Sequence, residues 1–475
     1  MNLKCLGRYT HRVPIANHDA PIASSRWKDG MSTSVLMSSA ASEEIQERNA
    51  VRRVSWRLLP FLFLLYLIAS IDRSNVAFAA LQMNHDLGFS ASVYGFGAGV
   101  FFVGYCLFEI PSNLILARVG ARRWISRIMV SWGIIACAMM LMRGRASFYT
   151  LRFLLGAAEA GFFPGMIFYL NHWFPAAEQA RAVSRFMMAI PVAGVVGGIL
   201  AGGLLGLDGT LGLTGWQWLF LLEGLPSVIL GVAVWFVLPD CPNDARWLGE
   251  HEQTALIAKL EAERAAVEMN HGRKSVRQAL THPLLWQLAA LWFLIAVCAY
   301  TFGFWAPQIL KATAGLTNTQ VGFTSALLTF ISIPFMLGWA AHSDRHGERR
   351  LHVALGGLVL TFGFLGAAFL HNPRLAIAAQ AIVWIGINMQ NGPFWSLPGS
   401  LTSGTAAAGG IALISSVAFM GGFVGPNVFG PVSDVSHGYR VGLSLLAALA
   451  IIASGIAFAL RSVSSVTGSD ETKGA

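Results

Sequence analysis

Long apolar stretches alternate with short polar segments along most of the chain. Twelve of them contain about 20 apolar residues, the length that a helix needs to cross about 30 Å of hydrocarbon. The pattern therefore predicts an all-α membrane protein with twelve transmembrane helices. The stretches are expected to begin near Trp56, Val93, Trp124, Phe148, Ala182, Trp216, Pro283, Val321, Leu351, Leu375, Gly409 and Val441.

One long polar segment separates the first six stretches from the last six. Its portion from Glu252 to Glu268 has a helix-forming composition. The start of the chain has no period and lacks the apolar core of a signal peptide. We expect a disordered cytoplasmic tail (1–50), an N-terminal six-helix bundle (51–238), a cytoplasmic central loop (239–282), a C-terminal six-helix bundle (283–462) and a cytoplasmic tail (463–475).

The composition agrees with this pattern. Of the 475 residues, 55% are hydrophobic and 12% are charged, whereas soluble proteins contain about a quarter charged residues. An ordinary soluble enzyme is therefore excluded. The chain also contains no G-x-x-x-x-G-K-[ST], H-E-x-x-H or serine-elbow motif. We expect no enzymatic activity, no cofactor and no metal.

The excess of positive charge predicts the orientation in the membrane. The chain has 33 Lys and Arg against 24 Asp and Glu, a net charge of +9. With both termini in the cytoplasm, and the first tail left out, twenty Lys and Arg lie inside and five outside, as the positive-inside rule requires. We therefore expect a multi-pass protein of the cytoplasmic (inner) membrane. No basic run with interleaved aromatics indicates binding to nucleic acid.

A short loop motif occurs once in each half of the chain. It follows the second and the eighth stretch, and each Arg and Gly of the second copy lies 227 residues after its counterpart. This spacing predicts two related halves with a site between them near the membrane midplane, and the loops are candidates for gating. The motif residues are Arg118, Gly120 and Arg122 in the first copy and Asp344, Arg345, Gly347 and Arg349 in the second.

Glycines recur every four residues in the fifth stretch. Such a ridge of small residues lets a second helix approach closely, and we expect a helix–helix interface there rather than a binding site. The ridge consists of Gly194, Gly198, Gly202 and Gly206.

Four charged residues stand within the first and fourth stretches. An ionised group at the bilayer centre costs about 2.5–3.5 kcal/mol, so such a charge indicates function by default. Two arginines facing one cavity would grip a carboxylate through paired N–H donors, and acids beside them could carry protons. Alternatively, the charges cap a span near the headgroups or pair between helices. The arginines are Arg73 and Arg152, and the acids are Asp72 and Glu159.

The second half has no charge within its stretches, and polar and aromatic residues occupy comparable places. Asn391 and Trp395 flank the Gly392-Pro393 break, where irregular backbone can line a cavity. They are candidates for substrate contact, although aromatic residues in membrane helices are more often packing residues.

Together these segments resemble the major facilitator superfamily and, more closely, its anion:cation symporter family, which includes carriers of tartrate, phthalate, hydroxyphenylacetate and sugar acids. The resemblance spans about 51–461. It is carried by the segments Ile71–Asn75, Glu109–Asn113, Arg152–Gly165, His342–Arg350 and Gly404–Gly410. Three positions depart from the family pattern. Ala117 replaces the usual acid of the first loop motif, and Ser415 and Phe419 stand where relatives often have asparagine, which favours a less polar cavity wall.

The resemblance implies a monomeric secondary transporter that imports a small organic anion together with protons by alternating access. It also implies that Arg73, Arg152 and Tyr105 bind the substrate and that Asp72 and Glu159 carry protons. An uncoupled facilitator or anion exchanger remains an alternative, and a transporter-like membrane sensor is a second one. The sequence does not specify the carboxylate or the proton stoichiometry.

Overall fold

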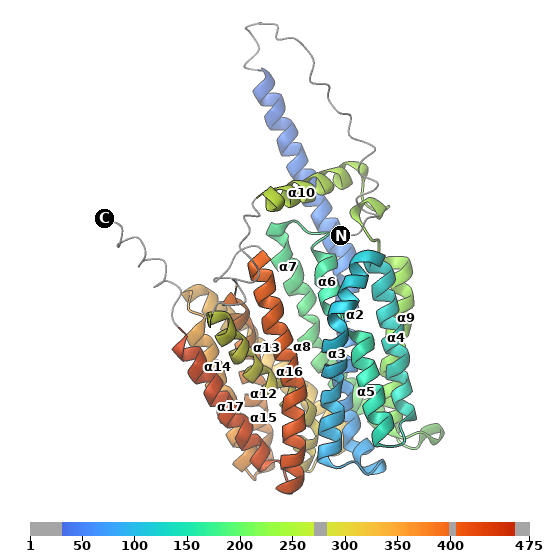
Figure 1. Ribbon diagram of the computed structural model, residues 1–475, viewed down its shortest axis with the longest axis vertical. Helices are drawn as coiled ribbons and strands as arrows, with labels where there is room; N and C mark the ends of the chain where they lie inside the picture. Colours follow the sequence, from blue (N-terminus) through green and yellow to red (C-terminus); the bar gives the residue numbers. More distant parts are fainter. Residues whose placement is uncertain (1–30, 270–282, 399–404, 461–475) are drawn as a thin grey trace, which may run out of the picture.

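The computed structural model describes residues 31–269, 283–398 and 405–460 (Figure 1). These residues form helices joined by short connections, and no β-strand occurs among them. Residues 1–30 of the expected first tail, 270–282 of the central loop and 463–475 of the expected last tail lie outside the described residues.

The first six spans form one bundle. The fourth span divides into two helices at Gly161, whose φ of 83° lies in the left-handed region, and the fifth divides at Met188. The helices of this bundle are α2 (Met31–Asp86), α3 (Ala91–Val119), α4 (Ala121–Ala138), α5 (Arg145–Glu159), α6 (Phe162–Leu170), α7 (Ala176–Met187), α8 (Ala189–Leu204) and α9 (Gly215–Val237).

The last six spans form the second bundle. Its helices are α12 (Pro283–Ala314), α13 (Asn318–His346), α14 (Arg350–Phe369), α15 (Pro373–Trp395), α16 (Thr405–Val435) and α17 (Arg440–Ala459). Among the described residues, eleven helices are long and apolar enough to cross a membrane. The twelfth span is α15, which has 23 residues but is made less apolar by Gln380, Asn388, Gln390 and Asn391.

Hydropathy located the spans closely, with one large difference. Nine of the twelve expected starts lie within three residues of an observed helix start. The first helix instead begins at Met31, so the expectation of a disordered tail up to residue 50 was wrong for 31–50. This stretch contains no Pro or Gly, and the membrane span that follows supplies a helix nucleus from which each added residue gains a hydrogen bond.

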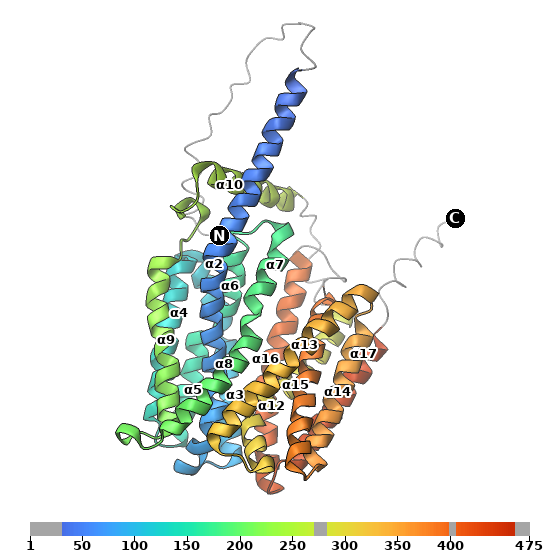
Figure 2. The ribbon, with the colours of Figure 1, turned by 180° about the vertical axis from the view of Figure 1, so that it is seen from behind.

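The central segment contains the expected helix, α10 (Glu250–Met269). It packs against the extension of α2 at one end of the molecule, which we call the α10 side (Figures 1 and 2). Ion pairs join the two helices, from Arg53 to Glu252 at 3.1 Å and from Lys259 to Glu47 at 3.9 Å. The polar connection between the bundles is thereby attached to the first bundle.

The two bundles meet through α3 with α16 (Figure 1) and through α8 with α13 (Figure 2). The glycine ridge of α8 lies at the second contact, as expected. A Cβ at Gly198 would lie 2.9 Å from the Gly322 carbonyl oxygen, and one at Gly202 would lie 2.9 Å from that of Thr319. The absence of side chains therefore allows the backbones of α8 and α13 to touch.

Hydrogen bonds between the bundles lie at the end opposite the α10 side. Asn84 donates to Gln308 at 3.1 Å, and the Lys311 ammonium donates to the Leu81 carbonyl at 3.2 Å. At the start of α3, the Asp434 carboxylate accepts from the backbone N–H groups of Ala91 and Ser92 at 2.9 and 2.8 Å. An acid at a helix N-terminus is favourable, so these bonds hold the bundles together at this end.

We expect the substitution Gly198→Val to separate the bundles at this end. Its side chain would collide with the backbone of α13, at a cost of about 1–3 kcal/mol for overpacking. Pulsed electron paramagnetic resonance between spin labels at Leu211 and Ala312, both exposed, would report a longer distance. The control is Gly203→Val, because no atom lies within 4 Å of a Cβ at Gly203. Equal distance distributions in the two variants would contradict the prediction.

Candidate functional site

An ion pair joins α2 and α5, the two helices of the first bundle that carry the predicted charges. The Arg73 guanidinium on α2 donates to the Glu159 carboxylate on α5. The Arg73 side chain is 17% exposed and that of Glu159 is 1% exposed. Glu159 and Arg152 stand in the same span, but the partner of Glu159 is Arg73, which comes from a different span.

Arg152 is completely buried and is held by α3. Its Nε and Nη2 donate to the carbonyl oxygens of Gly97 and Ala98 at 3.2 and 3.1 Å. The helices α5 and α3 can approach closely because Gly156 has no side chain. A Cβ at this position would lie only 2.0 Å from the Phe101 carbonyl oxygen. The Arg152 Nη1 has no hydrogen-bond partner. The guanidinium therefore keeps a positive charge and one unused donor group in the protein interior.

Aromatic rings surround the two guanidinium groups. The Phe101 ring lies 5.8 Å from the Arg73 Cζ and 4.9 Å from the Arg152 Cζ, distances suited to cation–π attraction. The Tyr105 ring lies 5.7 Å from the Arg73 Cζ and 5.0 Å from the Phe419 ring of α16. Through Tyr105, the surroundings of Arg73 thus extend to the second bundle.

Tyr105 is 1% exposed, and its hydroxyl has no hydrogen-bond partner. A buried tyrosine hydroxyl normally finds one. The unpartnered hydroxyl beside Arg73 is therefore available to a polar group of a bound molecule.

Asp72 faces the interior of the first bundle. Its Oδ2 accepts from the Trp132 indole of α4 at 2.7 Å and from the Ser227 hydroxyl of α9. Its Oδ1 is buried without a hydrogen-bond partner. Neighbouring residues on a helix are turned by about 100°, so Asp72 and Arg73 reach different surroundings from adjacent positions.

The second-half candidates are not brought to this site. The Asn391 amide donates to the Ile387 carbonyl within α15 at 3.3 Å. The Trp395 ring packs against Trp292 of α12 at 5.2 Å. Both contacts lie within the second bundle, and the ring contact of Trp395 is of the packing kind that is usual for aromatic residues in membrane helices.

Phe101 and the Asp72 partners Trp132 and Ser227 were not among the predicted site residues. Phe101 lies four residues before Tyr105, a spacing that places both on one helix face and could have indicated it. Trp132 and Ser227 are separated from Asp72 by 60 and 155 residues in the sequence. No local sequence pattern predicts contacts over such separations.

The two loop motifs both have a glycine at positive φ, but they form different ion pairs. Gly120 and Gly347 both have positive φ, 101° and 63°, which favours glycine in each copy. In the second copy Asp344 pairs with Arg349. In the first copy, where Ala117 replaces the acid, Arg122 is instead 3.8 Å from the Asp240 carboxylate and also donates to it from its backbone N–H at 3.0 Å. Arg118 and Arg345 form no ion pair with a described residue.

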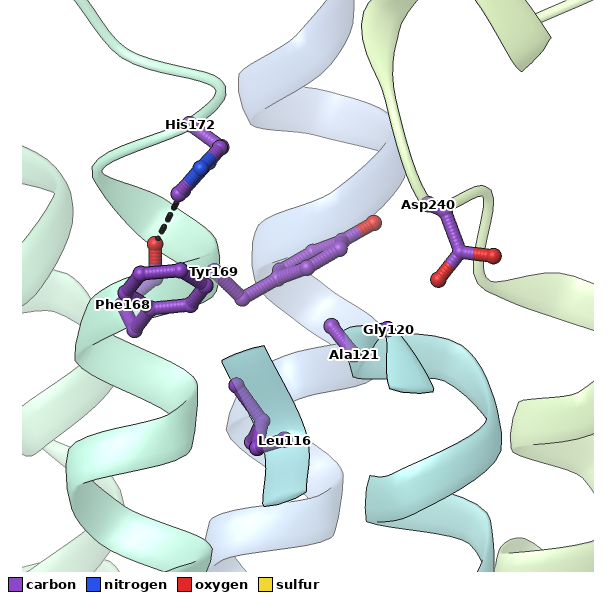
Figure 3. A pocket seen from close by; sticks show the side chains of 7 residues that line it. All are labelled: Leu116, Gly120, Ala121, Phe168, Tyr169, His172 and Asp240. Carbon is purple, nitrogen blue, oxygen red and sulfur yellow. Dashed lines mark hydrogen bonds between the residues drawn. The ribbon is translucent and has the colours of Figure 1, made fainter. Parts of the chain in front are cut away.

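A small pocket lies beside the first loop motif (Figure 3). The Tyr169 ring crosses it, and the Tyr169 hydroxyl donates to the Pro239 carbonyl at 2.8 Å. The pocket is separate from the Arg73–Glu159 pair and belongs to the connection between the first bundle and α10. Its lining consists of Leu116, Gly120, Ala121, Phe168, Tyr169, His172 and Asp240.

Comparisons with known proteins agree with this architecture. The chain is 46% identical over 408 residues to an Agrobacterium vitis protein provisionally named tartrate transporter, covering 86% of this chain and 94% of that protein. It is 41% identical over 411 residues to the Pseudomonas putida metabolite transport protein NicT, also provisionally named, covering 86% and 93%.

Solved structures show the same fold. The bacterial homologue of the human lysosomal transporter Spinster, in an inward-facing conformation, superposes with a TM-score of 0.71 at 18% identity, covering 85% of this chain and 96% of that one. The D-xylose–proton symporter gives a TM-score of 0.70 at 14% identity, covering 86% and 98%. The sequence profile of the Major Facilitator Superfamily matches residues 62–426, and the chain therefore belongs to this superfamily of membrane transporters.

Proposed function

We propose that this protein imports a small organic carboxylate by proton symport through alternating access. The observation that carries the proposal is the buried Arg73–Glu159 ion pair, which shares the Phe101 ring with Arg152 and lies beside Tyr105, the residue that contacts the second bundle. The tartrate transporter name of a 46% identical relative supports a small organic anion as the substrate.

The ion pair suggests how proton and substrate binding are linked. Without substrate, Glu159 neutralises the Arg73 guanidinium. A substrate carboxylate that replaces Glu159 on Arg73 would leave a second negative charge buried and unpaired, which is costly. Protonation of Glu159 removes that cost and frees Arg73. Anion binding is therefore most favourable when Glu159 holds a proton, and this gives cotransport of the two in one direction.

Two further groups complete the proposed substrate site. Arg152 supplies the second positive charge of this site and an unpartnered Nη1, and Tyr105 supplies an unpartnered hydroxyl. Phe101 and Phe419 form an apolar wall next to them. This combination favours a compact carboxylate with an apolar face, and the substrate is recognised mainly by its negative charge.

The position of the closed end supports an alternating-access cycle. The bundles are joined at the end opposite the α10 side, and the charge asymmetry predicts that the α10 side is cytoplasmic. With this orientation the extracellular end is closed. Separation at the glycine contact of α8 and α13, with closure at the α10 side, would expose the site to the outside.

Reconstituted protein provides the test of function. In proteoliposomes we expect labelled tartrate or phthalate to accumulate when the outside is made acidic, by about tenfold per coupled proton for one pH unit, because one unit corresponds to about 1.4 kcal/mol. A protonophore should abolish the accumulation. Counterflow without any response to the gradient would instead indicate a facilitator or exchanger, and binding without counterflow would indicate a sensor.

A further inference from the structure

Glu223 is a buried acid for which the proposed cycle has no role. It lies in the middle of α9, and its residue is 4% exposed. Both carboxyl oxygens are buried and make no hydrogen bond. An ionised carboxylate without a partner in such a place is strongly unfavourable, and a group so placed becomes neutral instead. In the conformation described here, Glu223 therefore holds a proton.

The position of Glu223 on α9 places it beside Asp72. Ser227 follows Glu223 by four residues, so both lie on one face of the helix. The Ser227 hydroxyl donates to the Asp72 carboxylate, and the Glu223 and Asp72 carboxyl groups interact electrostatically. Asn75, one turn after Asp72 on α2, also lies next to Glu223.

The surroundings contain few other groups that could share the charge. From α2, the titratable neighbour is Asp72. From α4, the titratable neighbour is the Cys137 thiol. Its sulfur would lie 2.9 Å from a Cβ built at Gly224, the residue that follows Glu223. The Cys137 thiol donates to the Leu221 carbonyl at 3.7 Å. No cation faces Glu223 among these neighbours, whereas Glu159 is paired with Arg73.

We propose that Glu223 and Asp72 form a coupled carboxyl pair that holds a transported proton in addition to the one on Glu159, so that each carboxyl titrates under the influence of the other. The inference rests on the proposed proton symport and adds Glu223 to its proton-binding groups. Two like charges so close cannot both ionise readily, and their protons leave in two steps that belong to the pair.

A purely structural role makes a different prediction. If Glu223 is a permanently neutral packing residue, glutamine replaces it with the same shape and charge, and no titration elsewhere changes. If Glu223 exchanges its proton, Glu223→Gln removes a group that becomes negatively charged. The titration midpoint of Asp72 then moves to lower pH, by about one unit for a coupled pair.

Infrared difference spectroscopy of the full-length protein in lipid, titrated with acid and base, measures both carboxyl groups directly. We expect Glu223→Gln and Asp72→Asn each to remove one protonated-carboxyl band and to shift the midpoint of the remaining one. The control is Glu261→Gln, because Glu261 is exposed on α10. Since coupling is reciprocal, either variant alone tests it if the other fails to fold. An unchanged midpoint, or no band lost with Glu223, overturns the inference.

Transport assays separate this inference from the proposed function. We expect Glu223→Gln to shift the pH dependence of uptake while the imposed proton gradient still drives some accumulation. Coupled transport with an unchanged pH profile in Glu223→Gln contradicts the pair but leaves proton symport intact. A wild-type protein without proton coupling contradicts the proposed function, while the infrared titration still reports whether the two carboxyl groups interact.

Discussion

Replacing Arg73 with alanine should destabilise the protein and abolish binding of a carboxylate. The substitution leaves Glu159, which is 1% exposed, without its ion-pair partner. Breaking a buried ion pair by removal of one partner costs about 3–5 kcal/mol. It also removes the guanidinium that we propose as the main anion ligand. Thermal unfolding in detergent and calorimetric titration with tartrate would measure the two effects.

A second substitution separates these effects. In the double variant Arg73→Ala with Glu159→Gln, no charge remains unpaired, so most of the lost stability should return. Binding should not return, because the anion ligand is still absent. Arg143→Ala is the control, since Arg143 is exposed in a connection between α4 and α5. Recovery of both stability and binding in the double variant would mean that Arg73 serves only to neutralise Glu159.

The positions of the spans could be predicted because hydropathy is a local property. A run of about 20 apolar residues marks a span wherever it lies in the chain. The helix at 31–50 was missed because its formation is not a local property. Those residues are polar enough to suggest a tail, but their helix depends on the nucleus supplied by the adjoining span and on contacts such as Glu47 with Lys259, which hydropathy does not register.

The identity of the charged residues could be predicted, but their pairing could not. Charge within an apolar run is visible in the sequence, and this selected Arg73, Arg152 and Glu159. Pairing depends on how each helix is rotated about its axis, and Arg73 and Glu159 are 86 residues apart. The carbonyl partners of Arg152 depend likewise on how closely α5 approaches α3, which Gly156 permits.

The second half offered weaker signals. Asn391 and Trp395 were selected because they flank a helix break, and in the structure they make contacts within their own bundle. Phe419 reaches the site instead. Phe419 is one of many apolar residues on α16, and the sequence does not distinguish it from the others. Its place next to Tyr105 depends on the packing of the two bundles.

Loss of one coupled proton with retention of exchange is the expected result of Asp72→Asn. The amide oxygen of the substituted side chain would still accept from Trp132 and Ser227, so the fold around it should persist. An amide cannot release a proton at any working pH. In proteoliposomes, accumulation driven by a gradient of one pH unit should fall by about tenfold, the contribution of one proton, while the proton on Glu159 still drives the remainder. Counterflow of labelled substrate should continue, because Arg73, Arg152 and Tyr105 are unchanged.

The comparison with Glu159→Gln makes this result specific. Neutralising Glu159 frees Arg73 from its ion pair, so anion affinity should rise and lose its dependence on pH. Neutralising Asp72 leaves the Arg73–Glu159 pair in place, so the pH dependence of anion binding should be retained while accumulation falls by the contribution of one proton. The control is again Glu261→Gln on α10. If Asp72→Asn accumulates substrate as strongly as the unchanged protein, Asp72 is a structural residue that anchors Trp132 and Ser227, and Glu159 alone carries the coupled proton.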